Sequence, residues 1–154
     1  MLMFDIWIAN EDRHDKNLAV DNVAMPTKMV VFDHDMALFG GCGTVGIERL
    51  NQLQFTRLGV TGGTVTGGNR HCLLDEMKTA EHFDQWLERI ATVPKHFIMS
   101  LCREAVRFGV ASQAEADAAV EFLEFRKRNI GLLVEMNRDA FTGITEWKKP
   151  GELF

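Results

Sequence analysis

Two short acidic segments contain the residues of this chain whose types and spacing could perform chemistry. The first, NEDRHDKN, occupies positions 10–17, and the second, VVFDHD, occupies positions 30–35. Asn17 follows Asp12 by five positions, and Asp33 directly follows an apolar run. A phosphoryl-transfer site needs an acid, an amide and a second acid, because catalysis there consists of positioning, charge neutralisation and proton acceptance.

Each of these polar side chains has a distinct expected role. We expect Asp12 to accept the proton of the attacking hydroxyl group. Mg²⁺ takes oxygen ligands and usually binds through one or two carboxylates together with phosphates, which Asn17 and Asp33 would complement. His14, two residues after Asp12, is expected to point toward the transferring phosphate as a hydrogen-bond donor.

At these positions the chain resembles the HipA-like kinases, which are bacterial relatives of the protein and phosphoinositide kinases. The segments that carry the resemblance are DRHDKN at 12–17, FDIWIA at 4–9 and FDHD at 32–35. The spacing from acid to amide equals that of the kinase catalytic-loop pattern H-R-D-x-x-x-x-N, and the FDHD acid resembles the metal-binding aspartate of D-F-G. The resemblance is sharp over positions 4–39.

The resemblance implies a catalytic base at Asp12, Mg²⁺ ligands at Asn17 and Asp33, and ATP as the phosphoryl donor. Only eleven residues precede Asp12, so no Gly-rich loop followed by a strand lysine stands before it. We therefore expect the catalytic part of the larger kinase lobe without the nucleotide-binding lobe. Asp35 replaces the glycine that usually follows at this turn, and the glycine-rich stretch 59–68 lies on the wrong side of the motif for a phosphate loop.

Two functional hypotheses follow from this resemblance. As a split or fragmentary kinase, the chain would transfer the γ-phosphoryl group of ATP to a hydroxyl of a protein or small molecule. As a kinase-derived interaction protein without catalysis, it would bind a partner chain or form a homodimer through apolar surface around Phe4, Trp7 and Phe32. A third alternative is that Met1 is an internal methionine of a longer protein.

A different chemistry uses some of the same residues. The pairs His14–Asp15 and His34–Asp35 could ligate divalent metal in an HD-type phosphohydrolase, where imidazole and carboxylate groups share one or two ions. That family carries its ligands mainly on helices, whereas these pairs fall at a loop and at a strand end. We rank this alternative below the kinase hypothesis.

Length, composition and charge indicate one cytoplasmic domain spanning residues 1–154. The 46% hydrophobic content suffices for an ordinary core, and the net charge of −5 argues against a nucleic-acid surface. The three cysteines, Cys42, Cys72 and Cys102, are odd in number and far apart, which argues against a disulfide framework or a structural zinc site. No apolar run approaches the length of a membrane span.

Hydrophobic periodicity predicts the elements that would position the site. A buried helix over 2–10 leads into the first acidic segment, and strands at 18–20 and 29–32 form a hairpin with a turn at Pro26. This hairpin places Asn17 at its entrance and Asp33 at its exit. The pattern weakens after position 39, where GGCG at 40–43 and the stretch 59–68 indicate a mobile loop.

The second half of the chain is predicted to be helical. Helices are expected over 79–91, from Pro94 to about Gly109, and from the N-cap Ser112 into Asn137. The fold class is thus α+β, mainly helical: a kinase-like larger lobe with a short β-hairpin carrying the catalytic and metal-binding loops.

Several other residues receive a structural interpretation. His71 and His82 are expected at the surface or as capping residues, and the methionines Met25, Met29, Met36, Met77 and Met99 as core filler. Phe122 and Phe125 are expected in the core, or in an interface, on a helix whose charged face carries Glu121, Glu124, Arg126 and Lys127.

Overall fold

The computed structural model describes residues 1–40, 45–53, 58 and 71–147. Its α-helices are α1 (Leu2–Ile8), α2 (Gly46–Leu53), α3 (Glu81–Ala91), α4 (Lys95–Arg107) and α5 (Gln113–Met136). Short 3-10 helices, η1 (Asp15–Asn17) and η2 (Arg138–Ala140), and the strands β1 (Leu18–Val20) and β2 (Met29–Val31) complete the described elements. The predicted class is confirmed at this level: the fold is mainly helical with a small antiparallel two-stranded sheet.

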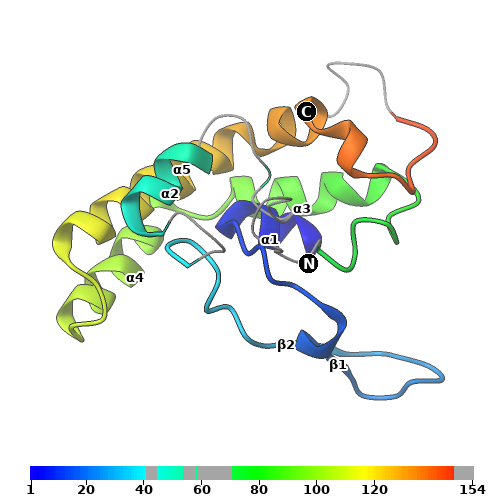
Figure 1. Cartoon of the computed structure of the whole chain (residues 1–154), viewed down its shortest axis with the longest axis horizontal. Helices are drawn as coiled ribbons and strands as arrows, with labels where there is room; N and C mark the ends of the chain where they lie inside the picture. The colour runs from blue at the N-terminus through cyan, green and yellow to red at the C-terminus, as the bar shows by residue number, and fades with distance from the viewer. Residues whose placement is uncertain (41–44, 54–57, 59–70, 148–154) are drawn as a thin grey trace.

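Helix α5 organises the molecule, because α1, α2, α3 and α4 all pack against it (Figure 1). Its start follows the predicted capping box: the Ser112 hydroxyl accepts a hydrogen bond from the Glu115 backbone N–H, and the Glu115 carboxylate accepts one from the Ser112 N–H. Buried residues recur along α5 at helical spacing from Ala116 to Val134, so one long face contributes to the core.

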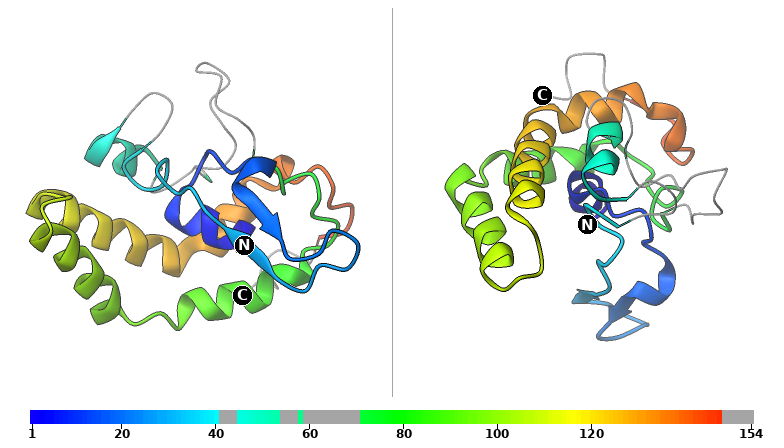
Figure 2. Two further views of the ribbon diagram at one scale, coloured as in Figure 1. Left: turned by 90° about the horizontal axis from the view of Figure 1, so that it is seen from below. Right: turned by 60° about the vertical axis from the view of Figure 1, so that its left-hand side comes forward.

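Helix α1 lies in the middle of the fold, with α2, α3 and α5 around it (Figure 2, right). The indole Nε1 of Trp7 donates to the carbonyl of Leu123 on α5 at 2.9 Å. The helix ends at Ala9, which adopts a left-handed conformation with φ 52° and whose N–H bonds back to the last turn. This ending turns the chain sharply into the first acidic segment.

The prediction that Arg126 lies on the charged face of α5 is wrong. Its side chain is completely buried and donates to the carbonyls of Ile6, of Leu53 at 3.3 Å and of Leu58 at 2.9 Å. Burial, together with the nearby positive charge of Arg49, lowers the pKa of its guanidinium to about 9. Arg126 therefore ties α5 to the end of α1 and to the segment after α2.

The predicted hairpin is present, with Leu18 opposite Val31 and Val20 opposite Met29. It extends away from the helices (Figure 1). For that reason the expected core role of two methionines is wrong: Met25 is 75% exposed and Met29 51% exposed. Met36, Met77 and Met99 are half-buried.

Helix α2 was not predicted, because it has few apolar residues and follows a glycine-rich segment. It buries Arg49, Leu50 and Leu53 against the core. The glycine-rich stretch at 59–68, expected to form a mobile loop, lies outside the described residues, as do Cys42 and most of GGCG. Among the described elements, no helix is both long and apolar enough to cross a membrane.

Candidate functional site

The buried Arg13 joins the two acidic segments. Its Nη1 donates to the carbonyl of Phe32 at 2.6 Å and lies 3.4 Å and 3.5 Å from the carbonyls of Asp33 and Asn17. The Phe32 N–H also donates to the Asn17 carbonyl at 3.3 Å, which continues the pairing of β1 with β2 by one residue. One guanidinium thus holds the entrance and the exit of the hairpin together.

Arg13 is itself held by a buried group that we call the Asp5 cluster, consisting of Asp5, Asn10, Arg13 and His71. Arg13 binds the Asp5 carboxylate in bidentate fashion, with Nε–Oδ2 and Nη2–Oδ1 distances of 3.0 Å each. His71 Nε2 lies 3.0 Å from Oδ2, and Asn10 donates to Oδ1 at 3.2 Å. The expected surface position of His71 is therefore wrong, because its ring is buried against Asp5.

The cluster stabilises the charged form of Asp5. Burial of this carboxyl raises its pKa, but hydrogen bonds from His71 and Arg13, and the charges of these two residues, outweigh the burial and lower the pKa to about 2 from 3.8. A folded-state pKa below the unfolded value stabilises the fold above pH 4 by about 2.5 kcal/mol, and this contribution is lost as the pH falls toward 2.

This linkage predicts a specific pH dependence. Between pH 5 and pH 2.5, the wild-type protein should lose about 1.5 kcal/mol more free energy of unfolding than Asp5→Asn, which has no carboxyl to titrate at this position. Urea unfolding curves of both proteins at the two pH values measure the difference. Equal losses would show that Asp5 titrates normally in the folded protein.

The backbones of the two predicted metal ligands lie near each other at the base of the hairpin, where Nη1 of Arg13 approaches both carbonyls. Asn17 directly precedes β1 and is buried, and its amide Nδ2 donates to the Asp12 carbonyl at 3.1 Å. This bond fixes the amide, leaving its oxygen to accept another partner. Asp33 follows β2 with a left-handed backbone, φ 59°, which is uncommon outside glycine but tolerated by aspartate.

The predicted catalytic residues lie in the adjoining loop. The Asp12 N–H contacts the side-chain oxygen of Asn10 at 3.4 Å, so its backbone is held from both sides. Its carboxylate Oδ2 lies 3.9 Å from Nε2 of His14. Nδ1 of His14 is buried, and no described residue hydrogen-bonds to it. Both side chains are half-buried, so each retains access to solvent.

Asp35, which the kinase hypothesis left without a role, is a third acid near Asp12 and Asp33. A hydrogen bond with the Asp33 carboxyl raises the pKa of Asp35, and the negative charges of Asp33 and Asp12 raise it further. Asp35 therefore lies close to Asp33 and adds negative charge beside it.

The donor set suits a hard divalent cation bound with few protein ligands. Asn17 and Asp33 offer an amide and a carboxylate oxygen, and the facing acid Asp35 adds negative charge. Over the described ranges, no group of three His, Cys, Asp or Glu side chains is arranged to hold a metal ion. An ion held by Asn17 and Asp33 would therefore need phosphate and water to complete its ligands, as Mg²⁺ usually does.

Three important residues of this region carried little signal in the sequence. Asp5 is an acid inside the otherwise apolar helix α1, which in itself indicates a buried partner. Arg13 belongs to the DRHDKN segment without a role assigned to it. His71 lies 66 positions from Asp5, so only the folded chain reveals their contact.

Comparisons with known proteins found no relative of this chain. No family model, curated protein or solved structure matches the chain.

Proposed function

We propose that this chain contains the catalytic and Mg²⁺-binding loops of a HipA-like kinase and transfers the γ-phosphoryl group of ATP to a hydroxyl acceptor. The observation that carries the proposal is the Arg13 bridge, which supports the carbonyls of Asn17, Phe32 and Asp33 from one buried guanidinium. A site of this type depends on fixed positions, and a clamp between the two loops supplies them.

The roles of the side chains follow from their surroundings. Asp12 would accept the proton of the attacking hydroxyl, since its carboxylate is accessible and its backbone is fixed. His14 would donate to the transferring phosphate through a ring nitrogen. Asn17 and Asp33 would hold Mg²⁺, which supplies charge neutralisation for the phosphate oxygens when bound.

The proposal concerns the catalytic and Mg²⁺-binding loops, which are the part of such a site that residues 10–35 could form. An interaction protein without catalysis is the second candidate, and an extended apolar groove on the helical face favours it. No observation in the structure favours the HD-type phosphohydrolase.

A metal-binding experiment tests the Mg²⁺ site without requiring the complete nucleotide site. Mn²⁺, which accepts the same oxygen ligands as Mg²⁺, should broaden the amide NMR signals of Asn17 and Asp33 selectively, and excess Mg²⁺ should reverse the effect. Asp33→Asn should abolish the broadening, because it removes the one charged ligand of the proposed pair.

A matched substitution controls for general loss of charge. Asp117→Asn removes an exposed carboxylate of α5 and should leave the broadening at the hairpin unchanged. Broadening spread over many exposed acids, or an Asp33→Asn variant that binds Mn²⁺ like the wild type, would contradict the proposed metal site.

A further inference from the structure

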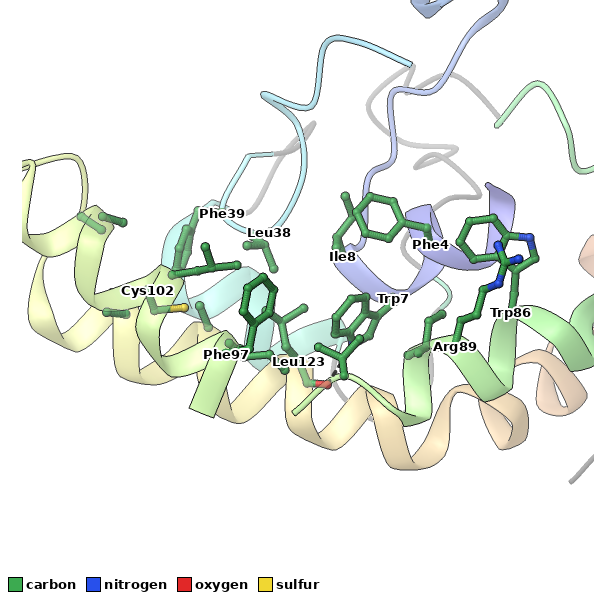
Figure 3. A pocket seen from close by; sticks show the side chains of 18 residues that line it. Phe4, Trp7, Ile8, Leu38, Phe39, Trp86, Arg89, Phe97, Cys102 and Leu123 are labelled. Atoms are coloured by element: carbon green, nitrogen blue, oxygen red, sulfur yellow. Dashed lines mark hydrogen bonds between the residues drawn. The ribbon is translucent and has the colours of Figure 1, made fainter. Parts of the chain in front are cut away.

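A long apolar groove lies on the helical face of the molecule and is not part of the acidic site. Its walls come from α1, α3, α4 and α5, and its volume is about 550 Å³. Residues that represent its lining are Trp7, Trp86, Phe97, Leu101, Ala105 and Leu123. Figure 3 shows Trp86 and Arg89 at one end, Phe39 and Cys102 toward the other, and Trp7 between them.

The groove is open along one side, because α4 packs only part of its apolar surface against the described fold. Phe97 is 52% exposed and Leu101 is 56% exposed, whereas Ile98 is the buried residue of this helix. Both exposed side chains belong to the lining. Exposed apolar side chains along an open groove are a candidate contact site.

The charge distribution of the groove is strongly asymmetric. Arg89 is the single charged side chain among the described lining residues, and it sits at the Trp86 end, with its guanidinium 5.4 Å from the centroid of that ring. In the described part of the chain, no carboxylate pairs with it. A ligand of this groove would therefore be apolar along its length and acidic at one end.

We propose that this groove binds an amphipathic α-helix of a partner protein, with apolar residues along the groove and an acidic residue facing Arg89. Helix-in-groove recognition uses apolar anchors at i, i+3, i+4 and i+7, which the apolar side chains along this groove could receive. The walls are helices, and Ala105 and Ala119 leave room for a close approach. The proposal does not depend on phosphoryl transfer.

Two other occupants fit the groove less well. An acyl chain would also present a carboxylate to Arg89, but small apolar ligands are usually enclosed over most of their surface, and Phe97 and Leu101 leave this groove open. A second copy would have to insert an exposed apolar helix. Leu132 and Met136 on α5 offer one, but they lie outside the groove, so the contact would be head-to-tail and not the self-complementary contact of a two-fold dimer.

Binding of a synthetic peptide tests the proposal. The probe is a fluorescently labelled helical peptide of about 16 residues with leucines at i, i+3, i+4 and i+7 and a glutamate at the end that faces Arg89; its matched partner carries lysine there. Fluorescence anisotropy should show that the glutamate peptide binds wild-type protein about fivefold more tightly than the lysine peptide. Arg89→Glu should reverse this preference.

A pair of identical substitutions separates the groove from general surface effects. Leu101→Asp places a charge on the groove wall and should weaken peptide binding at least about tenfold. Leu132→Asp makes the same change at a side chain that is equally exposed but lies outside the groove, and binding should be unchanged. Circular dichroism confirms that both variants remain folded.

Three results would overturn the proposal. One is that neither peptide binds or that both bind equally well to the wild type and to Arg89→Glu. Another is that palmitate binds to the groove and displaces the peptide, which would assign the groove to an acyl chain. The third is a dimer in light scattering that Leu101→Asp converts to a monomer, which would assign the groove to a second copy.

Discussion

Replacement of Arg13 by methionine should lower the free energy of unfolding by about 3–5 kcal/mol. The substitution leaves Asp5 as a buried carboxylate without its bidentate partner, and removal of one member of a buried ion pair costs this much because the remaining charge cannot reach water. It also removes the donor shared by the carbonyls of Phe32 and Asp33. Urea unfolding at pH 7 measures the change.

The control for this prediction is an arginine in an exposed pair. Arg107→Met removes the 3.2 Å contact with Glu104 on α4, and both side chains are largely exposed, so the change should stay within about 0.5 kcal/mol. A double-mutant cycle with Asp5→Leu should show that the two cluster substitutions together cost less than their sum. An Arg13→Met effect no larger than that of Arg107→Met would mean that the bridge does not stabilise the fold.

Replacement of Asp12 by asparagine should slow phosphoryl transfer by about 10²–10⁴-fold, the usual contribution of a positioned general base. The amide keeps the shape of the side chain but cannot accept the proton. The backbone contacts of Asp12 with Asn10 and Asn17 do not involve the carboxylate, so the loop should keep its conformation. This prediction rests on the proposed function.

The rate is measured as release of ADP from ATP with Mg²⁺, which allows water or any hydroxyl to act as the acceptor. Asp15→Asn is the matched control, because Asp15 is an exposed acid of the same loop and its substitution removes the same charge. Its rate should equal that of the wild type. If both variants are equally slow, the effect is one of local charge, and Asp12 is not the proton acceptor.

Much of the fold could be predicted because its signals are local. The N-cap Ser112 with Glu115 three residues later predicts the start of α5, and the structure contains both hydrogen bonds of that box. The hairpin was predicted from two short apolar runs separated by a turn. Patterns of this kind involve residues within a few positions of each other, so they can be recognised in the sequence without knowledge of the tertiary structure.

The site could be predicted only in outline. The spacing of Asp12, Asn17 and Asp33 is readable from the sequence, whereas the groups that hold them in place are not. His71 and Arg126 are polar residues that the sequence assigns to the surface, and both are buried by partners far along the chain. Burial of a polar side chain costs free energy unless hydrogen bonds replace those to water, and both side chains find such partners. Helix propensity and hydrophobic periodicity do not indicate which distant residues these partners are.

Helix α2 is an example of a helix that could not be predicted from the sequence. Of its eight residues, Arg49, Leu50 and Leu53 are buried, which is too few to give a clear helical period. Its stability comes instead from its packing against α5 and from Arg49, which donates to the carbonyls of Leu38 and, at 2.6 Å, of Ala9. Tertiary contacts therefore decide whether this segment is helical.

Because α1 packs against α5, it cannot reach its final contacts until α5 has been synthesised. The hydrogen bond from Trp7 ends on Leu123, 116 positions later, and ribosomes add about 5–20 residues per second, so about 6–23 s separate the appearance of the two partners. Throughout this interval α1, the apolar helix that leads into the first acidic segment, lacks the partner to which Trp7 donates its hydrogen bond. A nascent chain stalled before Leu123 should therefore expose Trp7 to chaperones, and the acidic loops should become ordered only after α5 has emerged.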